Sequence, residues 1–146
     1  MIRTSFTLVV AAAALAAHAD PIPADGAALK GVYGGSYVCQ DSEHGFYLDL
    51  ANVTPKDGGG FDASGVLGVF PSLAGASGQL ANVAGSFAVA GTIAADGALS
   101  MTPGDWLKEP AGYGAAALDA KIAVREDGAW AITGKPVVPG NEEFCS

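Results

Sequence analysis

The chain alternates between apolar and polar residues over short segments that are separated by turn residues. The clearest segment is 31–39, in which Tyr33, Tyr37 and Cys39 fall on one face, because strand side chains alternate with period two. The same period predicts further strands over 46–53, 65–70, 86–94, 99–101, 115–124 and 130–132. No long stretch of the chain beyond its N-terminal segment has the period of a helix.

Turn residues separate these runs at short intervals. Asp96-Gly97 and Asp127-Gly128 each lie between two alternating runs, which is typical of tight hairpin turns in which the glycine takes a positive φ. Most connections are therefore short enough for hairpins. The pattern predicts an all-β fold, a small antiparallel β-barrel or sandwich of seven or eight strands in largely up-and-down order.

The N-terminal segment has a different character. Arg3 precedes an apolar run over 6–17, and Ala17-His18-Ala19 has the small-x-small pattern of a cleavage site. We expect 1–19 to be a signal peptide, 20–28 a flexible leader, and 29–146 a single β-domain. The apolar run is too short to span a bilayer, so we expect a periplasmic or secreted protein without a membrane span.

Cys39 and Cys145 are the only two cysteines. In an exported protein such a pair is expected to form one disulfide, which here would tie the first predicted strand to the last segment. This arrangement suits a closed or nearly closed barrel. Two free thiols are the alternative.

Acidic residues outnumber basic ones by fifteen to seven, and the formal net charge is −8. Such a surface repels nucleic acid and anionic membranes, so we expect neither as a partner. It favours a cationic partner, although solubility after export explains the same charge.

The opening segment, Gly31 to Cys39, has the pattern Gly-x-Tyr-x-Gly-x-Tyr-x-Cys. Together with Gly85-Ser86-Phe87, with Trp106 ahead of Tyr113, and with the late Cys145, it resembles the opening of a recurring exported bacterial β-domain. The resemblance implies a β fold. No activity is known for that domain, so the resemblance implies no site residue.

No constellation of residues points to catalysis. His44 is the only histidine beyond the predicted signal peptide, and no serine lies in a Gly-x-Ser-x-Gly elbow. We expect His44 in an exposed polar turn over 40–45, with metal ligation as an alternative. No phosphate loop or dinucleotide fingerprint is present. We therefore expect no catalytic residue, no metal and no cofactor; an enzyme that uses surface carboxylates is the third and least favoured class.

Three groups of residues are candidates for binding. Trp106 and Tyr113, expected in a long loop over 101–114, could form a sugar-stacking or protein-binding surface or could fold back to plug one barrel end. The acidic turn that contains Asp41, Glu43 and His44 could enter a cleft. Tyr33 and Tyr37 could line a pocket for a small ligand or could fill the core.

The residues together favour an exported, non-enzymatic binding protein, monomeric, whose partner is a protein or a glycan in the cell envelope or outside it. An inhibitor of a cationic, lysozyme-like hydrolase is the specific form that the charge favours. The alternative is a small-ligand carrier barrel of the lipocalin or avidin type. We expect affinity to reside in the loops, because Tyr33, Tyr37, Phe46, Phe87 and Leu118 are among the side chains that could fill a small barrel.

Overall fold

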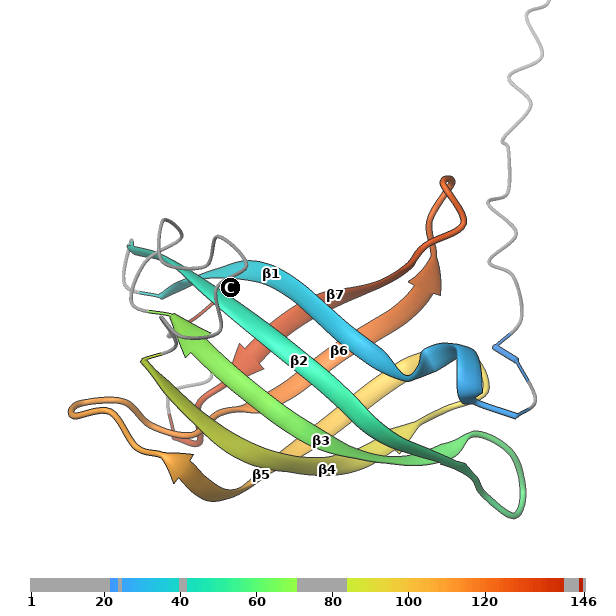
Figure 1. Ribbon diagram of the computed structural model, residues 1–146, viewed down its shortest axis with the longest axis horizontal. Helices are drawn as coiled ribbons and strands as arrows, with labels where there is room; N and C mark the ends of the chain where they lie inside the picture. Colours follow the sequence, from blue (N-terminus) through green and yellow to red (C-terminus); the bar gives the residue numbers. More distant parts are fainter. Residues whose placement is uncertain (1–21, 24, 40–41, 71–83, 141–144, 146) are drawn as a thin grey trace, which may run out of the picture.

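The computed structural model describes residues 22–23, 25–39, 42–70, 84–140 and 145, and it shows one antiparallel sheet of seven strands (Figure 1). Each strand pairs with its neighbours in the sequence, so the order is β1 to β7 without a crossover. The prediction of an all-β, up-and-down fold is confirmed. The elements are the 3₁₀ turn η1 (Ala27–Leu29), β1 (Gly31–Cys39), β2 (Ser42–Pro55), β3 (Phe61–Phe70), β4 (Gly85–Ile93), β5 (Ala98–Lys108), β6 (Ala117–Val124) and β7 (Trp130–Val137).

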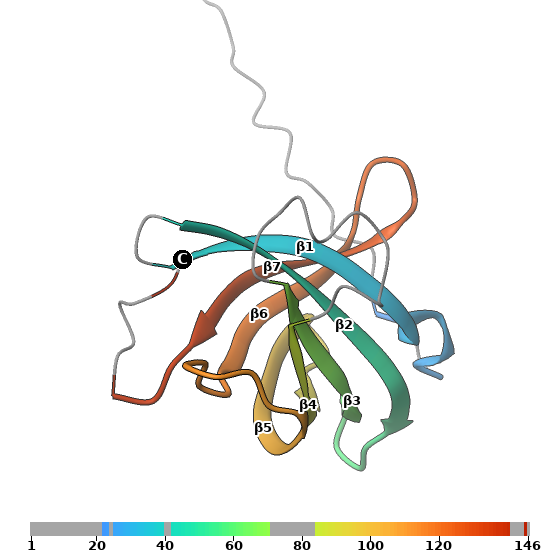
Figure 2. The same ribbon diagram turned by 60° about the vertical axis from the view of Figure 1, so that its left-hand side comes forward.

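The sheet curls into a nearly closed barrel, and this decides between the barrel and the sandwich. Figure 2 shows β6 and β7 returning beneath β1 after the sheet has turned through β3, β4 and β5. Residues of β1 and β7 come within 8 Å between Cα atoms, although these two strands are the ends of the hydrogen-bonded order. All six pairings are antiparallel, so β1 and β7 run in the same direction.

The inner face of the sheet carries the core, in the alternation that the sequence predicts. Leu48 and Leu50 are fully buried on β2, whereas Ala51 and Asn52 are exposed. Burial of each such large apolar side chain stabilises the fold by about 1.5–3 kcal/mol. The other large and fully buried side chains are Leu29, Phe87, Ile93, Leu99, Met101 and Ile122.

The turn η1 closes one end of the barrel. Leu29 is completely buried, and its carbonyl oxygen accepts a 2.7 Å hydrogen bond from the hydroxyl of Tyr33. Gly26 precedes η1 with φ at 66°, and a Cβ at this position would lie 2.8 Å from the ring of Phe61. The leader predicted for 20–28 is thus packed in part, because Ile22 also lies against the core. The predicted signal peptide, 1–19, lies outside the described residues.

Four strands, β2, β3, β5 and β7, are longer than the sequence predicts, and the extensions of β2 and β5 contain candidate residues. β2 begins at Ser42, so Glu43 and His44 lie in a strand and not in the expected turn. β5 continues through Pro103 to Lys108, so the expected long loop over 101–114 is wrong for its first half. Irregular register between β4 and β5 near Phe87 lets the ladder continue past a proline, as bulges do.

The two Asp-Gly hairpins share one geometry. Ala94 and Arg125 each accept a hydrogen bond from the glycine three residues on, and Asp96 and Asp127 each accept one from the backbone N–H two residues on. The loops are therefore three residues long, not the two-residue form, and each ends in a glycine at positive φ. The positive φ that the sequence predicts is confirmed.

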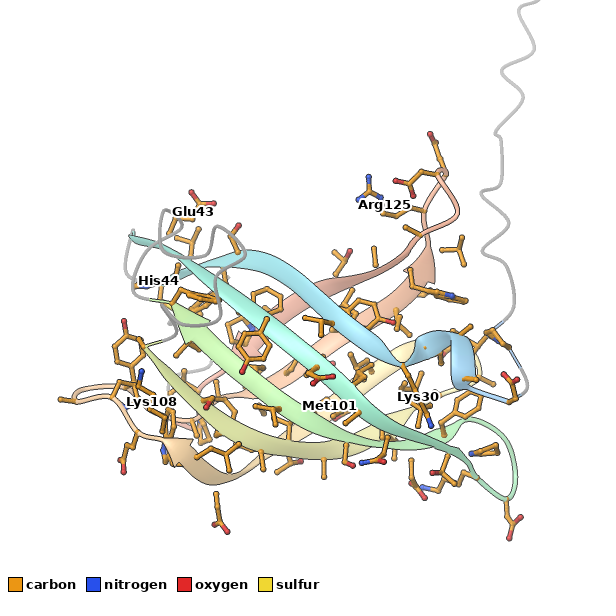
Figure 3. The ribbon with its side chains drawn as sticks, viewed as in Figure 1. Lys30, Glu43, His44, Met101, Lys108 and Arg125 are labelled. Carbon is orange, nitrogen blue, oxygen red and sulfur yellow. A yellow bond between two sulfur atoms is a disulfide. The ribbon has the colours of Figure 1, made fainter. Side chains whose placement is uncertain are left out.

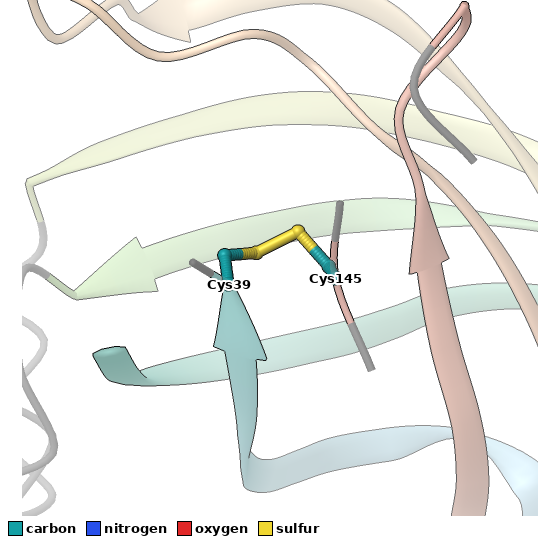
Figure 4. Close-up of a disulfide and its surroundings, with 2 residues drawn as sticks. All are labelled: Cys39 and Cys145. Carbon is teal, nitrogen blue, oxygen red and sulfur yellow. A yellow bond between two sulfur atoms is a disulfide. The ribbon is translucent and has the colours of Figure 1, made fainter. Parts of the chain in front are cut away.

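The structure joins Cys39 and Cys145 by a disulfide, with 4.2 Å between their Cα atoms (Figure 4). Cys39 is the last residue of β1, and Cys145 forms an antiparallel bridge with it. The bond thus fastens the end of the chain to the free edge of β1.

The two turn glycines offer a matched pair of substitutions. Gly128→Ala meets open space, so only the positive φ opposes it, at roughly 1–2 kcal/mol. A Cβ at Gly97 would in addition overlap the carbonyl oxygen of Ile122. We therefore expect urea denaturation to show a larger loss of unfolding free energy for Gly97→Ala than for Gly128→Ala. Equal losses would contradict the close approach at Gly97.

Loss of the disulfide should lower the free energy of unfolding by more than Gly128→Ala does. We expect Cys145→Ser to lower the free energy of unfolding by about 2–5 kcal/mol, because the bond closes a loop of almost the whole domain. Reduced wild-type protein is the control, and it should match the variant in a denaturation experiment. Recovery of both cysteines as free thiols in non-reducing peptide mapping would refute the bond itself.

Candidate functional site

A cavity of about 680 Å³ lies at the barrel end opposite η1. Its wall is formed by the second half of β1, the start of β2, the ends of β3 and β7, the starts of β4 and β6, the 109–116 connection and the disulfide. The barrel is therefore filled at one end and hollow at the other. This differs from the expectation that side chains fill the barrel throughout. The volume is in the range of sites for small organic molecules.

The cavity is lined by rings and aliphatic groups. Phe46, Phe87, Tyr37 and Tyr113 supply the phenyl and phenol rings, and no described residue of the wall is Asp, Glu, Lys or Arg. Polar atoms come from the two phenols, from His44 and from small hydroxyl and backbone groups. No carboxylate, amine or guanidinium of the described wall could pair with a buried ion, so this wall suits a neutral molecule.

Glycines on the first and last strands form part of the cavity wall. Gly34 and Gly35 on β1 and Gly134 on β7 line the cavity without side chains. At Gly35 the ring of Phe46 takes the place of a side chain, since a Cβ there would lie 2.8 Å from Cε1 of that ring. The motif glycines of β1 thus shape the cavity wall.

Tyr37 and His44 form a cross-strand pair at the cavity wall. They are directly opposite in the ladder between β1 and β2, and their rings stack with 5.4 Å between centroids at an interplanar angle of 23°. Nδ1 of His44 is buried and has no hydrogen-bond partner in the described part of the chain. Figure 3 labels His44 at this end of β2. The prediction that His44 sits in an exposed turn is wrong, because β2 extends over it.

The phenol of Tyr37 stays protonated over the whole physiological range. Burial, and secondarily the charge that Tyr113 would carry when ionised, raises the pKa of Tyr37 from 10.0 to about 12. Its hydroxyl can therefore act as a hydrogen-bond donor at any pH at which the protein works.

The predicted aromatic pair is divided by the structure. Tyr113 is half-buried in the connection between β5 and β6 and lines the cavity. Trp106 lies in β5, where it packs edge-on against Phe87 with 5.0 Å between ring centroids. Trp106 therefore packs beside the cavity residue Phe87 on the neighbouring strand and does not belong to a loop surface.

The other predicted candidates lie elsewhere. Glu43 is exposed on the outer face of β2 opposite Val38 (Figure 3). Tyr33 faces the barrel interior but bonds to Leu29 and is absent from the cavity wall. Asp41 lies outside the described residues.

His44 could have been found from the sequence. It continues the alternation of Phe46, Leu48 and Leu50 by one more step towards the N-terminus. The polar residues around it hid this register, because they are typical of a turn. The contribution of β7 to the cavity had no comparable signal, since it depends on how far the sheet curls.

The described ranges contain neither a group of metal ligands nor a membrane-spanning helix. No three His, Cys, Asp or Glu side chains are grouped there as metal ligands are. No helix of those ranges has the length and apolar composition needed to cross a membrane. Comparisons with protein-family models, with curated proteins and with solved structures produced no match to this chain.

The raised pKa of Tyr37 predicts a specific alkaline behaviour. The unfolded pKa is near 10 and the folded pKa is about 12, so the stability from burying the neutral phenol is complete below pH 10 and is lost as the pH rises towards 12. We expect ultraviolet titration to show one of the four tyrosines ionising last, and Tyr37→Phe to remove that step. Loss of the same step in Tyr33→Phe instead would contradict the assignment.

Proposed function

We propose that this chain is an exported, non-enzymatic binding protein that holds a small, neutral and mostly apolar molecule inside its barrel. The observation that carries the proposal is the 680 Å³ cavity, whose described wall contains the rings of two Phe and two Tyr side chains and no Asp, Glu, Lys or Arg. Apolar cavities with a few placed polar groups are the usual form of a small-molecule site. The disulfide supports export, because such bonds persist in oxidising compartments.

The barrel architecture supports the same function. One end is closed by η1 and by the large buried side chains around Leu29, so a ligand can enter only from the other parts of the wall. The free edges of β1 and β7 lie at the cavity, and no ladder joins these two strands in the described residues. Entry therefore requires no break in a strand pairing.

The acidic surface favours a second candidate function. With a net charge of −8 and an exposed Glu43 at the cavity end, the outer face suits a cationic protein, such as a lysozyme-like hydrolase. This function would use the surface and would leave the cavity without a role.

Filling the cavity tests the first function directly. We expect the neutral fluorescent probe N-phenyl-1-naphthylamine to bind the wild-type protein with 1:1 stoichiometry. Ala116→Phe places a ring in the cavity wall and should weaken binding at least tenfold, whereas Ala98→Phe, exposed and outside the wall, should leave it unchanged. Circular dichroism of both variants checks that the barrel is intact.

Other results of the same experiment would contradict the cavity function. Absence of probe binding to the wild type, or equal binding by the two variants, would refute the cavity function. Inhibition of a lysozyme that is weakened by Glu43→Gln and unaffected by Ala116→Phe would assign the activity to the acidic surface.

A further inference from the structure

Tyr33 and Tyr37 share the inner face of β1, but their hydroxyl groups have different surroundings. The hydroxyl of Tyr33 donates to the carbonyl oxygen of Leu29 at 2.7 Å and so belongs to the fold. Tyr37 lines the cavity, and within the described part of the chain its hydroxyl makes no such hydrogen bond. The hydroxyl of Tyr33 thus bonds within the fold, whereas that of Tyr37 is available to a bound molecule.

The ring of Tyr37 is held firmly while its hydroxyl is left free. It stacks on His44 and packs against Phe46, with 6.3 Å between those ring centroids. Tyr113 lines the same cavity from the β5–β6 connection, close enough to act on Tyr37 electrostatically. A ligand that covers this hydroxyl must accept its proton, because the hydrogen bond to solvent is otherwise lost without replacement.

We propose that the hydroxyl of Tyr37, with that of Tyr113 beside it, anchors the carbonyl oxygen of a neutral, ring-bearing ligand. This inference rests on the proposed function, and it names the ligand chemistry of that same cavity. A phenol donates one strong hydrogen bond, and a carbonyl oxygen accepts two. The aromatic walls contribute stacking area for a ring, and the described wall, which has no Asp, Glu, Lys or Arg, disfavours a carboxylate or an ammonium group.

His44 acts in this scheme as a positioning residue. Its stacked imidazole restricts the rotation of the Tyr37 ring and so fixes the direction in which the hydroxyl can donate. The protonated state of the anchor does not change below pH 10, because burial holds the pKa of Tyr37 at about 12. The selectivity for a carbonyl should accordingly be constant from neutral to mildly alkaline pH.

A pair of probes that differ only at the carbonyl group tests the anchor. 2-Acetylnaphthalene and 2-isopropenylnaphthalene have the same shape, but only the first has an acceptor oxygen. We expect calorimetry to show that the wild type prefers the ketone by about two- to tenfold, the value of one net hydrogen bond. Tyr37→Phe should abolish this preference, Tyr113→Phe should reduce it, and Tyr33→Phe, which lies outside the cavity wall, should retain it.

The outcomes separate this inference from the function on which it rests. Binding of neither naphthalene by the wild type would refute the cavity function. Equal affinity for the two probes in the wild type, or an unchanged preference in Tyr37→Phe, would overturn the carbonyl anchor while leaving the cavity function intact. Loss of the preference in Tyr33→Phe as well would show that it reflects barrel stability and not the anchor.

Discussion

A seven-stranded up-and-down sheet cannot close on itself by antiparallel pairing, because its first and last strands run in the same direction. This constraint governs the whole molecule. The sheet curls until β7 lies near β1, yet no ladder joins them in the described residues. The disulfide between Cys39 and Cys145 closes one end of this seam, and η1 closes the opposite end of the barrel. The seam between β1 and β7 therefore affects both the stability of the barrel and access to its interior.

The inner face of the sheet serves two purposes along its length. Near η1, large residues such as Leu48, Leu50 and Met101 meet and fill the barrel. Towards the disulfide, the backbone of Gly34, Gly35 and Gly134 forms part of the wall, and the cavity remains. A cavity forgoes the dispersion contacts that close packing would provide. The cross-link offsets that cost by restricting the unfolded chain. The stability that the barrel loses to its cavity is thus offset by the stability that it gains from the disulfide.

Much of the site follows from the period-two pattern, and the failures have identifiable causes. The alternation along β1 places Tyr37 on the inner face. The acidic and small residues around His44 favour a turn, but strand pairing with Tyr37 prevails. Pro103 and Gly104 interrupt the alternation near Trp106 and favour a loop, but irregular register opposite Phe87 accommodates them in a strand. In each case tertiary pairing overrode a local preference.

The sequence by itself determined the all-β class, the strand order, the positive φ of the Asp-Gly turns, most residues of the inner face and the pairing of the two cysteines. These depend on local alternation, on turn chemistry and on the presence of two cysteines in the sequence. The tertiary structure alone decided that the barrel is filled at one end and hollow at the other, and that Tyr37, His44 and Tyr113 meet at one wall. The reason is physical: the curl of the sheet sets how far apart β1 and β7 lie, and no local pattern encodes that distance.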